Sequence, residues 1–87
     1  VTHLLINHHA YAIGSALAIA EISQEGIVTD PNRAAFTLFS RAGDIWLDPG
    51  KEQNLTLNRQ PVSQSVRVTP GDQLTVAGID CQLISAG

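Results

Sequence analysis

Cysteine and methionine are almost missing from this chain, and the shortage of cysteine limits where it works. The 87 residues include one cysteine, Cys81, and no methionine. A lone cysteine cannot form a disulfide within the chain, whereas small secreted domains are usually held together by several. We therefore expect a reducing compartment and a cytoplasmic location, and we expect Cys81 to be a small buried hydrophobic residue.

Positive charge is also scarce. Five Lys and Arg residues stand against eight Asp and Glu residues, which gives a formal net charge of −3. The cations are spread along the chain, so the sequence argues against a nucleic-acid partner, whose phosphates attract clustered Lys and Arg. The longest strongly apolar run, residues 16–22, is far shorter than the roughly 20 residues that cross a bilayer, so we expect no membrane span.

Length and composition predict one globular domain. Single domains usually contain about 50–250 residues, and the hydrophobic fraction of 44% supplies enough material for a core. We expect residues 1–87 to form a single domain. Because the chain begins with Val1 and shows no basic-then-apolar signal segment, we interpret it as a piece of a longer protein.

β-Branched residues and regularly spaced turns predict an all-β fold. Ile, Val and Thr supply 20 of the 87 residues, and all three favour strands. Turns rich in Gly, Pro, Asp and Asn recur every 8–12 residues or so, roughly the spacing of a sandwich or barrel. Between them lie short alternating segments that should each bury one face, namely residues 35–39, 45–47, 55–57, 66–68, 74–76 and 79–84. We predict a two-sheet antiparallel β-sandwich.

Two segments depart from this alternation. Leu4-Leu5-Ile6 is apolar throughout, as in a strand that is covered on both faces. Ser15–Glu25 has a helix-capping residue, good helix formers and a following glycine, but its apolar residues do not share one helical face. The sequence therefore allows either a strand or a helix for this segment. Gly78 predicts a tight hairpin between the last two strands.

The polar residues form no recognisable catalytic or metal-binding motif. His3, His8 and His9 lie close in sequence, but adjacent strand residues point to opposite faces and are poor joint ligands. We interpret Asp44 and Asp48 as carboxylates that cap backbone amides at turns. The sequence contains no Gly-x-Ser-x-Gly motif and no phosphate-binding glycine loop. We therefore predict a domain that is not an enzyme and binds no metal or cofactor.

Five stretches, taken in order, resemble a forkhead-associated (FHA) domain. They are Tyr11-Ala12-Ile13-Gly14, Arg33-Ala34-Ala35-Phe36, Asp44 to Gly50, Leu57-Asn58 and Pro70 to Gly78. The resemblance spans nearly the whole chain. It implies an FHA-like β-sandwich of about eleven strands whose apical loops bind phosphothreonine peptides.

The residues that contact phosphate in that family are replaced in this chain. Ser15 stands where the family has an Arg, and Pro31 stands where it has a Ser. Ala34 replaces a structural His, and Gln53-Asn54-Leu55 occupies the place of Asn-Gly-Thr. A phosphate needs charge-assisted donors to offset its desolvation. We therefore predict a protein-recognition or assembly module that does not depend on phosphothreonine, with a protein partner or a neighbouring domain of the parent chain.

The same alignment gives the candidate contact residues. Apical loops often carry recognition because they vary while the sheets supply the core. In the FHA-like register these loops hold Ser15, Asn32, Arg33, Gln53 and Asn54.

Trp46 gives an alternative interface. It lies between Ile45 and Leu47, so it points outward if those two residues face the core. An outward Trp is a common interface anchor and suits self-assembly or the addition of a peptide strand. The other interpretation is a Trp that packs under a loop or against the second sheet.

Two further readings of the whole chain stay open. Residues 55–62 followed by residues 68–76 are similar to the closing hairpin of an S4-type RNA-binding module. That module needs two basic helices before the hairpin, whereas residues 34–47 alternate like strands and contain one cation, Arg41. An assembly domain whose edge strands pair with a second copy would need no binding motif.

Overall fold

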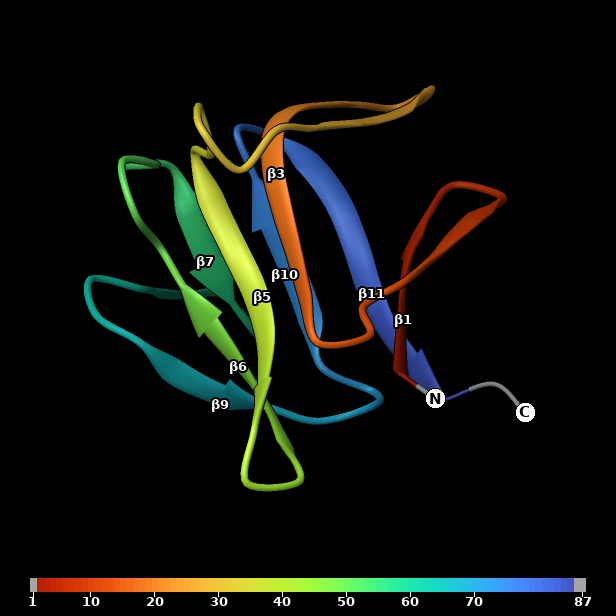
Figure 1. Cartoon of the computed structure of the whole chain (residues 1–87). Helices are drawn as coiled ribbons and strands as arrows, with labels where there is room; N and C mark the ends of the chain where they lie inside the picture. The colour runs from red at the N-terminus through yellow and green to blue at the C-terminus, as the bar shows by residue number, and fades with distance from the viewer. Residues whose placement is uncertain (1, 86–87) are drawn as a thin grey trace.

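The computed structural model describes residues 2–85, which form two antiparallel β-sheets packed face to face (Figure 1). The strands are β1 (Thr2–Ile6), β2 (His9–Ala12), β3 (Ala16–Ser23), β4 (Gly26–Thr29), β5 (Phe36–Arg41), β6 (Asp44–Asp48), β7 (Leu55–Leu57), β8 (Gln60–Pro61), β9 (Val66–Val68), β10 (Gln73–Val76) and β11 (Ile79–Ser85). The first sheet has the order β2-β1-β11-β10-β7-β8 and the second β4-β3-β5-β6-β9. The predicted all-β sandwich is confirmed.

The core lies between the sheets and is built from one face of each alternating strand. In β5, Phe36 and Leu38 are buried while Thr37 faces the other way, and in β10 Leu74 and Val76 are buried on either side of a half-buried Thr. The core residues are Leu4, Ile6, Ile13, Ile19, Phe36, Leu38, Leu47, Leu55, Val68, Leu74, Val76, Cys81 and Leu83. Burial of these apolar side chains is the main favourable term in folding.

The segment that had good helix propensity forms strand β3. It pairs with β5 over residues 16–19 and with β4 over residues 19–23, so each half has a strand partner for its backbone. Ile19 is fully buried, and Leu17 and Ile22 pack against the core. A bulge between Ile19 and Glu21 shifts the alternation, which explains the irregular apolar pattern. Pairing and burial outweigh local helix propensity here.

The apolar run in β1 has one buried face, so the expectation of cover on both faces is wrong. Leu4 and Ile6 are buried in the core, but Leu5 is half-buried on the outer face of the first sheet. Strand β1 is flanked within its sheet by β2 and β11. Within residues 2–85, no third layer covers the outer face of this sheet.

Asp72 joins two turns at the end of the sandwich where β7 and β9 finish. Its Oδ2 accepts a hydrogen bond from the Thr69 backbone N–H at 2.8 Å, and its Oδ1 accepts one from the Asn58 side-chain amide at 3.2 Å. The Asn58 carbonyl oxygen Oδ1 in turn accepts the Gln73 backbone N–H at 2.9 Å. These bonds tie the β7–β8 turn to the β9–β10 turn, which fits the stabilising role expected of a carboxylate at a turn.

The Asp72→Ala variant should unfold more easily. We expect the free energy of unfolding to fall by about 1 kcal/mol, because the Thr69 and Asn58 donors lose their acceptor, and any partner affinity should be unchanged. Urea unfolding followed by tryptophan fluorescence measures the change. The matched control is Asp80→Ala, which removes a carboxylate that accepts the exposed Thr75 hydroxyl and should leave the midpoint nearly unchanged. Equal midpoints for the two variants would contradict the role of Asp72.

The turn between β7 and β8 holds two residues with positive φ. Asn58 has φ 50° and Arg59 has φ 70°. Two-residue hairpin loops of type I′ need positive φ at both positions, and Asn-Gly suits them best. Asn58 fits this turn, but an arginine in the left-handed region is strained by roughly 1–2 kcal/mol.

The Arg59→Gly variant should therefore be more stable than the natural chain. Relief of strain exceeds the extra entropy of glycine in the unfolded state, so we expect a gain of about 0.5–1 kcal/mol. Thermal unfolding measures it as a higher Tm. Asn58→Gly serves as the control, because it also permits the turn but removes the bonds to Asp72 and Gln73; its Tm should fall. A lower Tm for Arg59→Gly would show that the arginine stabilises the turn.

Candidate interaction site

One end of the sandwich, the loop end, gathers four connections between strands. They are the β3–β4, β4–β5, β6–β7 and β10–β11 loops, which lie together at the top of Figure 1. The Ala35 carbonyl oxygen accepts hydrogen bonds from the Lys51 N–H at 2.8 Å and the Glu52 N–H at 3.2 Å. The Ala77 N–H donates to the Asn54 carbonyl at 2.8 Å. The β6–β7 loop is thus tied to the β4–β5 loop on one side and to the β10–β11 turn on the other.

Gly50 makes this close approach possible. It has φ +55°, and a Cβ at this position would lie 2.6 Å from the Ala35 carbonyl oxygen. The Asp48 Oδ1 accepts the Gly50 N–H at 3.0 Å, which fixes the start of the loop. Asp48 therefore caps a backbone amide, as predicted from the sequence.

Four of the five predicted contact residues belong to the loop end. Asn32 and Arg33 lie in the β4–β5 loop, and Gln53 and Asn54 lie in the β6–β7 loop. All four are exposed. The bonds that Ala35 accepts bring these two loops together, so the structure groups these residues as the sequence analysis expected.

Ser15 does not lie with the other four. It precedes β3, and its carbonyl oxygen accepts the Ser40 N–H at 2.9 Å near the far end of β5. The loop end meets β5 at Phe36, and four residues of extended strand separate Phe36 from Ser40 by about 13 Å. The grouping of Ser15 with the loop end is therefore corrected, because the turn before β3 lies at the opposite end of the sandwich.

The guanidinium at the loop end is already paired. Arg33 Nε donates to Asp30 Oδ2 at 2.9 Å, and Asp30 Oδ1 accepts the Asn32 backbone N–H at 3.0 Å. The Arg33 bond, followed by the Asn32 amide, holds the pKa of Asp30 below its usual value. The same pair, with a smaller contribution from Glu21, raises the pKa of Arg33. One Arg33 N–H therefore binds Asp30, and nearby carboxylates offset the charge of the guanidinium, so an anion at this site meets like charge.

The loop end as a whole carries an excess of negative charge. Its carboxylates are Glu21, Glu25, Asp30, Asp48 and Glu52, and its cations are Arg33 and Lys51. This excess of negative charge favours partners with neutral or basic groups and disfavours anions.

Trp46 points outward from the second sheet, as its position between two core-facing residues predicted. Its cross-strand neighbours are Phe39 on β5 and Arg67 on β9. The Arg41 guanidinium carbon lies 5.6 Å from the centroid of the Trp46 ring, within cation–π distance. Phe39 and Trp46 are half-buried and lie outside the core cluster.

Phe39 and Arg41 also belong to this outer face, although neither was predicted from the sequence. The signal was present, because Phe36 and Leu38 face the core, so residue 39 must face outward. The alternative interface is therefore a sheet face with two aromatic rings and flanking arginines rather than Trp46 alone.

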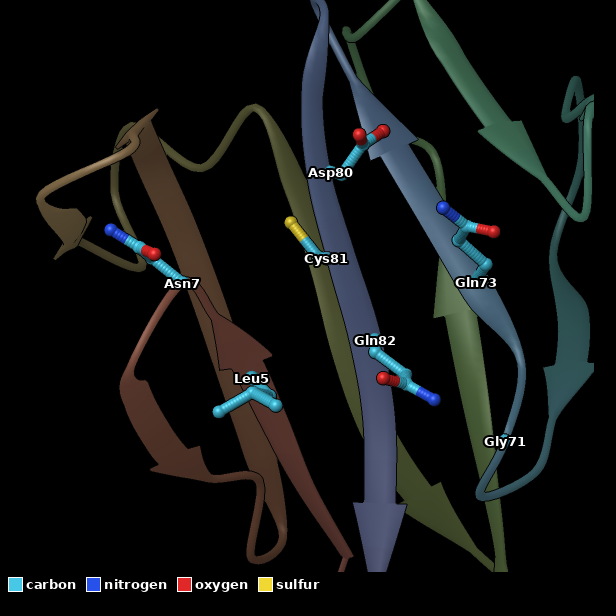
Figure 2. A pocket seen from close by; sticks show the side chains of 7 residues that line it. All are labelled: Leu5, Asn7, Gly71, Gln73, Asp80, Cys81 and Gln82. Atoms are coloured by element: carbon cyan, nitrogen blue, oxygen red, sulfur yellow. The ribbon is translucent and has the colours of Figure 1, made fainter.

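An open hollow of about 320 Å³ lies on the outer face of the first sheet (Figure 2). Leu5, Gln82 and Gln73 lie side by side there, because they pair across β1, β11 and β10. Asp80 also lines the hollow, and its Oδ1 accepts the Thr75 hydroxyl at 3.2 Å. The lining offers amide groups and one hydrogen-bonded carboxylate, which suits weak polar contacts.

Cys81 lines the floor of the same hollow but is buried within the core cluster. Its Sγ is 3.8 Å from the Ile79 carbonyl oxygen. Burial, with a smaller effect of Asp80, raises the pKa of the thiol to about 12. Since the thiolate is the reactive form, the thiol is inert near neutral pH. The expectation that Cys81 is a small buried residue is confirmed.

The histidines and the remaining acidic residues are dispersed. His8 and His9 are exposed near the β1–β2 turn, and His3 is half-buried on β1. Asp44 opens β6 and Asp48 closes it. Within the described residues 2–85, no group of three or more His, Cys, Asp or Glu side chains is placed to hold a metal ion. That part of the chain also forms no helix long and apolar enough to cross a membrane.

Comparisons with known proteins do not assign the chain to a family. No protein-family model, no curated protein and no solved structure matches it. The FHA resemblance therefore rests on the sequence motifs alone.

Cys81 should resist thiol reagents in the native state. We expect it to react with a disulfide reagent at pH 8 at least about 100-fold more slowly than in urea, because it is buried and protonated. Its pKa of about 12 exceeds the ordinary value of 9.0, so the unfolded chain loses this proton first. The free energy of unfolding should therefore fall as pH rises from 9 to 12.

The control for this pH dependence is Cys81→Ala, which removes the thiol. The alkaline loss of stability should be shallower in this variant than in the natural chain when urea midpoints are compared. The same slope in both proteins, or equal reaction rates in the native and unfolded states, would contradict the assignment of Cys81.

Proposed function

We propose that this domain is a non-catalytic protein-recognition module, similar to an FHA domain, whose loop end docks a protein without requiring phosphothreonine. The observation that carries the proposal is the Asp30–Arg33 ion pair within a loop end rich in carboxylates. A phosphate dianion on the remaining Arg33 N–H groups would lie beside Asp30 and near Glu21, whose like charges oppose it. A neutral or basic segment meets no such cost.

The arrangement of strands supports the FHA-like part of this proposal. The described residues contain eleven strands in two sheets, in agreement with the strand number that the sequence resemblance implies. Two of the three loops that the motif alignment gives as binding loops, the one with Asn32 and Arg33 and the one with Gln53 and Asn54, meet at one end.

The rigidity of the loop end supports recognition. Three backbone hydrogen bonds hold the β6–β7 loop against its neighbours, and Asp30 and Asp48 hold two further backbone amides. A pre-ordered loop loses little conformational entropy when it binds, so more of the contact free energy appears as affinity. Asn32 and Gln53 present exposed side-chain amides on this platform.

The S4-type RNA-binding alternative is not supported. It needs two basic helices before the closing hairpin, and residues 36–48 instead form strands β5 and β6 with their connecting turn. The described cations are also dispersed over both ends of the sandwich. An RNA-binding module would need its Lys and Arg residues gathered on one surface.

Peptide titration tests the proposed function. A peptide selected from a random unmodified phage library is added to ¹⁵N-labelled protein, and amide shifts should concentrate at Asn32, Arg33, Gln53 and Asn54. Matched phosphothreonine and threonine peptides should show no phosphate-dependent binding tighter than about 10 µM, roughly −7 kcal/mol. Asp30→Asn is the matched variant, because it frees Arg33 and should increase the phosphopeptide affinity.

Two results would contradict this proposal. Phosphate-dependent binding by the natural chain that is lost in Arg33→Ala would mean that Arg33 binds phosphate despite the carboxylates beside it. Shifts confined to Trp46 and Phe39, with the amides of the loop end unchanged, would move recognition to the outer face of the second sheet.

A further inference from the structure

The sandwich has an open side bounded by strands β2 and β4. Strand β4, Gly26–Thr29, is an edge of the second sheet and pairs within residues 2–85 with β3 alone. The β3–β4 and β1–β2 hairpins project toward the same side of the molecule, at the upper right of Figure 1. An edge strand directs alternate backbone N–H and C=O groups away from its sheet, where an added strand can pair with them.

The edge at β4 lacks the features that usually block such pairing. Natural edges are protected by proline, charge or very short length. Strand β8 has two residues and contains Pro61, and β9 has three residues and contains Arg67. Strand β4 contains neither proline nor charge, and Val28 is 47% exposed, the large hydrophobic side chain most open to solvent in the described part of the chain.

A hollow beside β4 provides apolar contact for an added strand. It has a volume of about 380 Å³, and its apolar lining comes from Tyr11, Ile22, Ile27 and Val28. Tyr11 reaches across from the first sheet, and a Cβ on Gly26 would collide with its hydroxyl. Ile27 packs against the core and the adjacent Val28 faces outward. A strand beside β4 would therefore find apolar contacts for side chains on both of its faces.

Carboxylates at this edge determine the charge of the partner. Glu21 lies on β3, directly opposite Val28 of β4, and Glu25 lies in the β3–β4 turn. Both carboxylates line the hollow. In a second copy paired antiparallel through its own β4, Glu25 before one strand would lie opposite Asp30 after the other. Like charges at close range oppose such a dimer, whereas Lys or Arg at these places would be attracted.

We propose that the free edge of β4 binds an extended segment of another protein by strand addition, and that this segment has β-branched residues flanked by Lys or Arg. Backbone hydrogen bonds provide the affinity, and the contacts at Val28 and in the hollow select the side chains. This surface goes beyond the proposed function, because its contacts lie on β4 and not in the β6–β7 loop. Docking at the loop end changes the amide shifts of Gln53 and Asn54, whereas strand addition protects the amides of Gly26–Thr29 from hydrogen exchange. One proposal can therefore be contradicted while the other stands.

The probe is a synthetic peptide of sequence Lys-Lys-Val-Thr-Ile-Thr-Val-Lys-Lys, added to the ¹⁵N-labelled chain. We expect saturable binding and slower hydrogen exchange of β4 amides. A peptide with glutamate in place of lysine should bind at least about fivefold more weakly. Val28→Lys should weaken binding of the first peptide by at least about fivefold, because it removes apolar contact and adds like charge.

Matched variants isolate the edge from general effects of charge and folding. Gln64→Lys adds the same charge in the remote, exposed β8–β9 loop and should bind like the natural chain. Thr29→Lys is a second edge variant, used if Val28→Lys loses its dispersed spectrum, and should also weaken binding. Glu21→Gln combined with Glu25→Gln should bind more weakly and with less dependence on salt.

Several outcomes would overturn the proposal. These are no saturable binding of the lysine-flanked peptide, equal binding of the glutamate-flanked peptide, or protection of amides outside β4. A concentration-dependent dimer in sedimentation that Val28→Lys abolishes would show that a second copy occupies the edge instead.

Discussion

The burial of the inner face of each sheet against the other is the interaction on which the rest of this molecule depends. Alternate residues supply it, such as Phe36 and Leu38 from one sheet and Leu74 and Val76 from the other. Each such side chain contributes roughly 1.5–3 kcal/mol when fully buried. Within residues 2–85 no buried polar side-chain atom lacks a hydrogen-bond partner, so the core has no internal polar penalty. The outer faces, edges and loops therefore carry the residues available for recognition.

Local sequence was sufficient to predict most of this fold. Strands such as β5 and β10 alternate regularly and end at turns, so their inward faces could be read from residues like Leu38 and Leu74. Strand β3 was ambiguous because its bulge at Ile19 breaks the alternation, and its strand neighbours lie elsewhere in the sequence. Leu5 was misjudged for a related reason, since the number of layers over a sheet is not a local property.

The candidate site was only partly predictable, because a motif alignment orders residues without saying at which end of a strand they fall. Consecutive antiparallel connections alternate between the two ends of a sandwich, so Ser15, before β3, is separated from Gln53 and Asn54. The Asp30–Arg33 pair depends on side chains three residues apart and was accessible in principle. The exposure of β4 depends on which strands neighbour it, which no local pattern reports.

The unequal distribution of charge also affects how fast partners arrive. The loop end is rich in carboxylates, whereas at the other end Arg41 and Arg59 are balanced by Asp44 and Asp72. A basic partner is therefore turned toward the loop end as it diffuses in, and productive encounters become more frequent. Salt screens such forces over roughly 8 Å at physiological ionic strength, so the association rate constant falls with added salt while dissociation changes less.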